Sequence, residues 1–452
     1  MTTGHHEGQE PPFVRLRAAP SEVEEPRWWR WLVAGVFAGA LALQVHQVNT
    51  ATVFRFAVPD VFDERLPINT APGTKHPLLA VFLIRIPLAL GSRSPFAVRL
   101  PFVVLSMAGL ICAYLLARRG FGRWPALLAL ILLSVDQFHI IRSRTASEAV
   151  ALAFVAPILY VFYRAVTENR PNLLAAAGLL VGIGYHGKED TLLPAFALGL
   201  FLLAHRSRRR WFRRKELYGA LFIVAALVLL DVYFNVSDTA RNLTLLSQNV
   251  ARVGLTLRAT GLYLGELFLR TLNNPAEFVW RHNLWDWEVP TTNWVAGLLC
   301  LGAAVYATRR YRNEPTSLLL WVFWIVFAAA SIFSPTHGLL EVKHKKWAGA
   351  SLIPAAILAG SLLYQGVRRR RPAQLLVAAL LGYFIGNGIR ISLVQENVYS
   401  LPPQAVALER VMRQRRAMDL WQQCPPWMAP PAPRSTAPAS AKALDASPGR
   451  GL

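Results

Sequence analysis

The chain is built from long apolar runs separated by short polar connections. A helix of about 20 apolar residues crosses the ~30 Å hydrocarbon core of a bilayer. Several runs approach this length, and flanking residues can extend the others. The pattern predicts an all-α, polytopic membrane helical bundle. Its predicted apolar helices lie near residues 31–48, 78–90, 100–117, 124–135, 145–163, 172–186, 191–205, 216–234, 294–307, 316–333, 347–366 and 373–389.

The run at 78–90 differs from the others because it is short and contains Arg85. At 1.5 Å per residue it forms a helix roughly 20 Å long, which is shorter than the hydrocarbon core. We therefore predict that this helix lies at the membrane interface. The remaining eleven runs are predicted to cross.

Charge sets the predicted orientation. The chain has 48 Lys and Arg against 26 Asp and Glu, a net charge of +22. A soluble nucleic-acid-binding protein can carry this charge, but the many apolar runs exclude that class. Cytoplasmic loops are enriched in Lys and Arg. With eleven spans and a cytoplasmic N-terminus, five basic connections face the cytoplasm, namely Arg118–Arg123, Glu168–Arg170, Arg206–Lys215, Arg309–Arg312 and Arg368–Arg371.

The same assignment divides the chain into three regions. Residues 1–30 form a cytoplasmic tail, whose five glutamates and missing apolar core do not fit a cleaved signal peptide. Residues 31–390 form the transmembrane domain, with large external loops at 49–99 and 235–293. Residues 391–452 form an external tail that is rich in Pro and Ala and is predicted to be disordered from about residue 424.

Charged residues also gather in the predicted external segments. An acidic pair, Asp63 and Glu64, follows the first span, and Asp60 is an alternative acid nearby. Charged groups at the level of a membrane bundle are costly and often mark a functional site. The other candidates in these segments are Lys75, His76, Arg144, Glu148, Lys188 and Lys346.

A carboxylate surrounded by cations fits sugar transfer from a polyprenyl-phosphate donor. The carboxylate accepts a proton from an acceptor hydroxyl, while the cations stabilise the phosphate leaving group. Apolar helices can hold the isoprenoid tail. Each candidate also has a structural interpretation, since Arg144 and Glu148 are spaced as a helical i, i+4 ion pair and Lys75 can snorkel at the interface.

An ordered series of residues carries a resemblance to a known family. It contains the Asp63-Glu64 pair, His76-Pro77, the run from Gly91 to Pro101, Ser143-Arg144 followed by Glu148, Gly182-x-Gly184-x-x-x-Lys188, and Lys346-Trp347. Over roughly residues 31–365 the chain resembles the GT-C glycosyltransferases. It is most similar to the branch of protein O-mannosyltransferases, aminoarabinose transferases and bacterial family-39-like enzymes.

The resemblance implies roles for individual residues. Asp63 matches the catalytic base of the family, with Glu64 and Glu148 orienting groups or sharing the proton load. Lys75, His76, Arg144, Lys188 and Lys346 match positions that bind the donor phosphate. These roles imply an inverting glycosyltransferase at the outer face of the cytoplasmic membrane, acting on a lipid, glycan or protein acceptor.

No metal or other cofactor is predicted. Asp63, Asp136, His139 and Glu148 have side chains that suit a divalent cation, but their spacing does not establish a site. Two other functions remain open. One is a transporter or lipid flippase, for which charge at mid-membrane depth is expected and Asp231 is the nearest example. The other is a catalytically inactive GT-C-like scaffold.

Overall fold

The computed structural model describes residues 25–46, 78–91, 95–136, 139–140, 143, 146–188, 191–204, 206–234, 294–333 and 349–398. These residues form helices and short connections, without a strand among them. The all-α fold is thus confirmed. The helices are α1 (Arg27–Val45), α3 (Leu78–Ala89), α4 (Pro95–Phe121), α5 (Arg123–Val135), α7 (Ala146–Thr167), α8 (Asn172–Tyr185), α9 (Leu192–Ala204), α10 (Lys215–Phe234), α14 (Trp294–Arg309), α15 (Glu314–Phe333), α17 (Leu352–Val367) and α18 (Arg371–Val398), with 3₁₀ helices η3 (Arg206–Arg213) and η5 (Gly349–Ser351).

Each predicted apolar run corresponds to one of these α-helices, with shifts at the ends. The largest shift is at α18, which continues to Val398 and so passes the predicted domain boundary at 390. The basic run 206–215, predicted as a connection, contains η3. The short run at 78–90 is helix α3, and Pro87 lies inside it.

Within the described residues, four helical segments are both long and apolar enough to cross a membrane, as judged by length and composition. They are Arg27–Val45, Arg99–Phe121, Lys215–Tyr233 and Arg371–Ile389. Shorter apolar helices, among them α5, α8, α9 and α17, accompany them. The chain is therefore a membrane protein, and the count of eleven spans stays a prediction.

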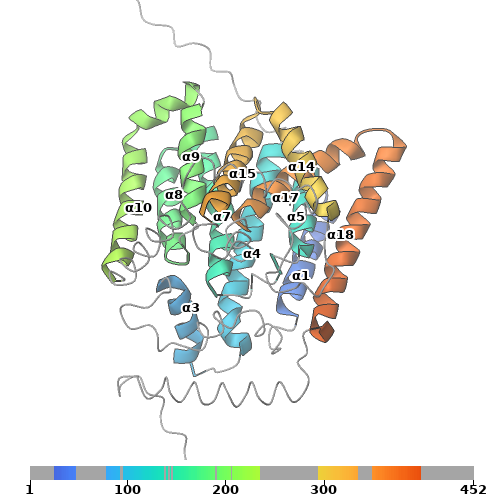
Figure 1. Ribbon diagram of the computed structural model, residues 1–452, viewed down its shortest axis with the longest axis horizontal. Coiled ribbons are helices and arrows are strands. Elements are labelled where there is room, and N and C mark those ends of the chain that lie inside the picture. The colour runs from blue at the N-terminus through green and yellow to red at the C-terminus, as the bar shows by residue number, and fades with distance from the viewer. Residues whose placement is uncertain are drawn as a thin grey trace, which may run out of the picture. The chain divides into compact units, whose positions relative to one another are not determined.

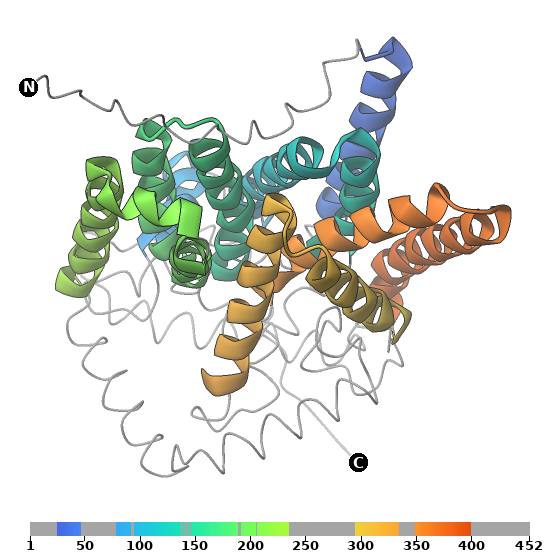
Figure 2. The same cartoon turned by 90° about the horizontal axis from the view of Figure 1, so that it is seen from above.

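Helices α4, α5, α7 and α17 form the centre of the bundle, while α10 and α18 lie at opposite sides (Figures 1 and 2). Both of these outer helices expose several large apolar side chains, such as Phe222 and Leu375. A lipid environment accounts for this exposure, because lipid tails cover apolar side chains as well as a protein core does.

Small residues allow the helix axes to approach closely. A Cβ atom added to Gly178 on α8 would lie 2.6 Å from the carbonyl oxygen of Ala220 on α10, and one on Gly360 of α17 would lie 2.7 Å from the backbone nitrogen of Ala129 on α5. Neither contact leaves room for a side chain. Close packing of small residues is a main source of helix association in membranes.

The connections alternate between two ends of the bundle. The links α4–α5, α7–α8, α9–α10, α14–α15 and α17–α18 contain the five basic runs, and we call the end where they lie the basic end. Ion pairs join Arg119 to Glu168 and Arg208 to Glu314, so the α4–α5 link lies beside the α7–α8 link and the α9–α10 link beside the α14–α15 link. Helix α3 lies at the other end, which we call the α3 end (Figure 1).

Candidate functional site

Three separate parts of the chain meet at the α3 end. The backbone N–H of Leu79, at the start of α3, donates a 2.8 Å hydrogen bond to the carbonyl oxygen of His186, which follows α8. The next residue, Gly187, packs against α7, because a Cβ atom at Gly187 would lie 1.8 Å from Cγ1 of Val150. The turn at residues 186–188 therefore connects the first turns of α3 and α7.

Lys188 is held in this turn through its main chain. Its N–H donates to the carbonyl oxygen of Gly184 at 2.9 Å. Its own carbonyl oxygen accepts hydrogen bonds from the hydroxyl of Thr191 at 2.9 Å and the backbone N–H of Thr191 at 3.2 Å. Its side chain is only 9% exposed. A cation in such a position is desolvated, which strengthens its attraction to an anion.

Two of the eight predicted site residues lie within the described part of the chain. They are Lys188 and Glu148, whose backbone lies in the first turn of α7, two positions before Val150. Gly187 and Val150, which pack together, lie one position before Lys188 and two positions after Glu148 in the sequence. The other six predictions, Asp63, Glu64, Lys75, His76, Arg144 and Lys346, concern positions outside the described residues.

A second polar cluster connects α1, α4 and the segment before α7. Nε2 of Gln44 lies 3.4 Å from Nδ1 of His139, and Oγ of Ser106 lies 3.4 Å from its Nε2. The Asp136 carboxylate accepts a 2.8 Å hydrogen bond from the backbone N–H of His139. Because an amide nitrogen can only donate, this arrangement matches a neutral ring that accepts at Nδ1.

Burial favours the same neutral state of His139. The side chain is 4% exposed, and desolvation lowers its pKa to about 4. The charged form is therefore disfavoured in the folded protein. His139 acts here as a polar connection between helices, five positions before Arg144 and nine before Glu148.

Several residues at the α3 end carry no role in the sequence-based site. Arg99, at the start of α4, is fully buried, and Gln44 is buried in the last turn of α1. Polar residues within predicted membrane helices are energetically costly, so their presence in the sequence could have marked these positions as candidate site residues. His186 and Asp231 are a further example, since Nδ1 of His186 lies 3.7 Å from Oδ1 of Asp231.

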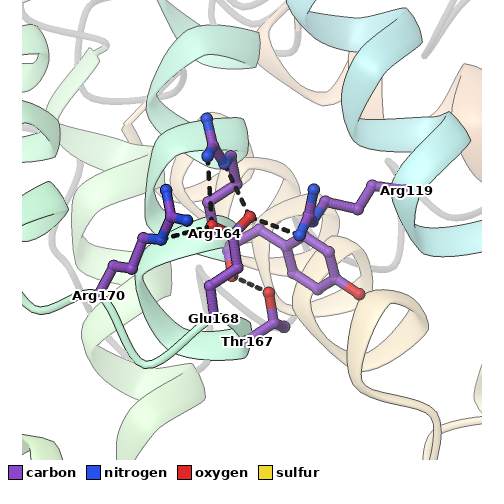
Figure 3. A network of polar contacts seen from close by, with 6 residues as sticks. Arg119, Arg164, Thr167, Glu168 and Arg170 are labelled. Atoms are coloured by element: carbon purple, nitrogen blue, oxygen red, sulfur yellow. Dashed lines mark hydrogen bonds and ion pairs between the residues drawn. The ribbon is translucent and has the colours of Figure 1, made fainter. Parts of the chain in front are cut away.

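The basic end has a different kind of polar network, centred on Glu168 (Figure 3). Its Oε1 and Oε2 accept hydrogen bonds from Arg164 at 2.8 and 3.2 Å, and Arg119 and Arg170 form ion pairs with the same carboxylate. The hydrogen bonds from Arg164, together with the nearby positive charges, lower the pKa of Glu168. One carboxylate thus ties the α7–α8 link to the α4–α5 link.

A cavity of about 520 Å³ also lies at the basic end, lined by residues 308–313. It includes Arg309, Arg310 and Arg312 but none of the predicted site residues. We place the candidate site at the α3 end, because Lys188 and the first turn of α7, which carries Glu148, both lie there.

The described residues do not support a metal site. No group of three or more His, Cys, Asp or Glu side chains suited to hold a metal ion occurs among the described residues. Asp136 and His139 are neighbours, but His139 is engaged with Gln44 and Ser106.

A family model of known proteins matches the region of the chain that contains the candidate site. Residues 75–234, about a third of the chain, match the family model described as dolichyl-phosphate-mannose-protein mannosyltransferase. This segment contains α3 through α10 and therefore all three parts that meet at the α3 end. Among curated proteins, none matches the sequence significantly.

Solved structures match this chain over 83% of its length. One is the archaeal oligosaccharyltransferase AglB from Archaeoglobus fulgidus, in complex with an inhibitory peptide and a dolichol-phosphate, with a TM-score of 0.50 and 12% identity, covering 83% of this chain and 56% of that one. Another is ArnT from Cupriavidus metallidurans bound to undecaprenyl phosphate, with a TM-score of 0.46 and 14% identity, covering 83% of this chain and 65% of that one.

The fold defines this chain as a polytopic helical membrane protein. Its predicted resemblance to the GT-C superfamily of glycosyltransferases is confirmed by the family-model match and by the shared fold. At 12% identity, the similarity to AglB concerns the fold alone, and the chain spans about half the length of that protein.

Proposed function

We propose that this protein is an inverting glycosyltransferase that moves a monosaccharide from a polyprenyl-phosphate donor to an acceptor. The single observation that carries the proposal is the junction of α3, α7 and the 186–188 turn inside the segment that matches the mannosyltransferase family model. Leu79 follows Lys75 by four positions, so the junction joins the segments that carry Lys75, Glu148 and Lys188.

In the proposed reaction, Asp63 accepts the proton of an acceptor hydroxyl as its oxygen attacks the anomeric carbon. The bond between that carbon and the phosphate oxygen breaks, and its electron pair leaves with the phosphate. A single displacement inverts the configuration at the anomeric carbon. Glu64 and Glu148 orient the reacting groups, while Lys75, His76, Arg144, Lys188 and Lys346 stabilise the phosphate charge.

The proposed donor is consistent with what similar proteins bind. The AglB structure contains a dolichol-phosphate, which is a polyprenyl-type phosphate. Apolar helices around the α3 end offer a lipid tail the same environment as the bilayer. The acceptor is a lipid, glycan or protein of the cell envelope.

The proposed location is the cytoplasmic (inner) membrane, with the N-terminus inside and the site and C-terminus outside. The grouping of the five basic connections at one end of the bundle supports this orientation. Labelling of single cysteines introduced near Lys188 and near Arg312 with a membrane-impermeant reagent in intact cells tests it. We expect labelling only near Lys188, and the reverse pattern would contradict the orientation.

Purified protein in liposomes, given a panel of labelled polyprenyl-phosphate sugars and membrane extract, tests the reaction. We expect transfer of label by the wild type, loss of transfer in Asp63→Asn, and retention in the matched control Asp60→Asn. Full activity of Asp63→Asn would refute the assignment of the base. Movement of donor lipid across the bilayer without transfer would instead identify a flippase, and neither activity would identify a scaffold.

We also propose that transfer requires no metal, since the cations assigned to the phosphate are side chains. Activity should then persist after treatment with a chelator. Loss of activity that Mn²⁺ or Mg²⁺ restores would contradict this.

A further inference from the structure

Asp231 is a carboxylate in a helix that is long and apolar enough to cross a membrane, and it lies three positions before the end of α10. Its side chain is 16% exposed, and that of His186 is 10% exposed. A charged residue in such a place is costly and is functional by default, with its nearest polar neighbour as the expected partner. The neighbour is His186, whose Nδ1 lies 3.7 Å from Oδ1 of Asp231.

Close helix packing holds the two residues opposite each other. A Cβ atom at Gly182 on α8 would lie 2.3 Å from Cδ1 of Leu227 on α10, so the helices are in direct contact there. His186 follows Gly182 by four positions, and Asp231 follows Leu227 by four positions. One further helical turn from this contact therefore places the imidazole against the carboxylate.

His186 is also the residue through which the turn is attached to its surroundings. Its carbonyl oxygen accepts the hydrogen bond from Leu79 on α3, and the two residues after it are Gly187, which packs on α7, and Lys188. A contact that fixes the imidazole of His186 therefore also restrains the segment that carries Lys188 and the start of α3.

We propose that Asp231 is a positioning residue that acts through His186 to fix the 186–188 turn, and thereby sets how tightly Lys188 binds the donor phosphate. The proposal rests on the proposed function for the role of Lys188. The proposal gives Asp231 no part in bond breaking, and its effect on the donor is exerted through His186.

Donor kinetics test the effect on binding. In Asp231→Asn, which keeps the shape of the side chain and removes its charge, we expect a donor KM about 10-fold higher, with kcat and the acceptor KM within twofold of wild type. Asp231→Glu should restore part of the donor affinity. The matched control is Glu216→Gln, which changes a carboxylate in the first turn of the same helix, at the basic end, and should leave all three parameters unchanged.

A purely structural role for Asp231 predicts a different result. Partial misfolding lowers the active fraction, and hence kcat, while the donor KM of the remaining molecules stays the same. That outcome, or donor kinetics equal to those of the wild type, would overturn the proposal.

Hydrogen exchange provides a measurement that does not depend on transfer. We expect the amide of Leu79 to exchange several-fold faster in Asp231→Asn than in the wild type or in Glu216→Gln, because its acceptor is the carbonyl of His186. Unchanged exchange would overturn the positioning role even in an active enzyme. A wild type that transfers no sugar, but whose Leu79 amide responds to Asp231→Asn, would contradict the proposed function and the donor-binding part while leaving the positioning of the turn supported.

Discussion

The two ends of the bundle use polar residues in different ways. At the basic end, arginines from separate links converge on carboxylates, with Glu168 contacting three of them and Glu314 contacting Arg208. At the α3 end, backbone hydrogen bonds and histidine contacts connect the helices, such as Leu79 to His186 and Gln44 to His139. The basic end is joined by ion pairs in which arginines share carboxylates, whereas the contacts at the α3 end combine main-chain hydrogen bonds with histidines and the carboxylates of Asp136 and Asp231.

This difference suits the two ends to different tasks. Where carboxylates already neutralise arginines, the charge serves the structure and the orientation of the protein in the membrane. At Lys188 the main chain fixes the backbone through hydrogen bonds with Gly184 and Thr191, so the position of this cation does not depend on side-chain contacts alone. Preorganised cations of this kind stabilise a developing anion with little reorganisation.

The largest expected effect comes from removing the cation at the α3 end. Lys188→Ala should lower kcat/KM for the donor about 100-fold, which corresponds to a charge-assisted contact of about 2 to 3 kcal/mol. The matched control is Lys215→Ala at the basic end, which should have wild-type kinetics. Steady-state transfer assays measure both, and equal effects of the two variants would remove the distinction between the ends.

Gly187→Ala should also impair the α3 end, because the added methyl group collides with Val150. The turn must shift away from α7, and we expect roughly a 10-fold loss of kcat/KM with the helix content unchanged by circular dichroism. A shift of about 1 Å is sufficient for such a loss. Gly219→Ala is the control, since a Cβ atom there meets open space. Wild-type activity in Gly187→Ala would show that the spacing of the turn and α7 is unimportant.

The pH dependence of stability tests the neutral cluster around His139. Its folded-state pKa of about 4 lies below the ordinary value of 6.5. Between these values the unfolded state binds more protons, so the stability linked to this group is complete above pH 6.5 and is lost as the pH falls toward 4. The full loss is about 3 kcal/mol.

Thermal unfolding of the detergent-solubilised protein at several pH values between 7 and 5 measures this loss. The wild type should become less stable toward pH 5, and His139→Gln, which retains a polar side chain, should show a shallower dependence. Parallel curves for the two proteins would mean that His139 is charged or solvated in the folded state.

The smallest effect on sugar transfer is expected at the basic end, where a substitution should alter stability alone. Glu168→Gln leaves Arg119, Arg164 and Arg170 without their shared carboxylate and should reduce stability by about 2 kcal/mol, since hydrogen bonds to charged groups contribute on this scale. Glu25→Gln, which affects one pair with the half-exposed Arg118, should cost less. Transfer kinetics of the folded fraction should match the wild type in both variants. A changed donor KM would connect this network to the site.

The positions of the helices along the chain could largely be predicted from the sequence, because long apolar runs and basic links are strong signals. The short α3 and the grouping of the Arg118, Arg206 and Arg309 runs at one end follow from those signals alone. The helix ends were less predictable. Helix α18 passes residue 390 because polar residues such as Gln395 continue a helix as readily as apolar ones do.

The candidate site could be predicted only in part. Lys188 and Glu148 are predicted from their place in a family-like series, and the structure adds that their neighbours Gly187 and Val150 pack together. The contact between His186 and Asp231 joins residues 45 positions apart, and a single sequence contains no pairing signal at that distance. The hydrogen bond from Leu79 to His186 uses main-chain atoms, so the identities of these two residues do not predict it.

That main-chain bond also bears on how the sequence can vary. Any residue with an N–H at position 79, and any residue at all at position 186, supplies the same donor and acceptor. The donor and acceptor atoms of this bond therefore survive almost every single substitution at these two positions. Proline at position 79 is the exception, since the first turn of a helix accepts its ring while the donor disappears. The atoms of this bond are thus far less exposed to genetic drift than the histidine and carboxylate side chains around them.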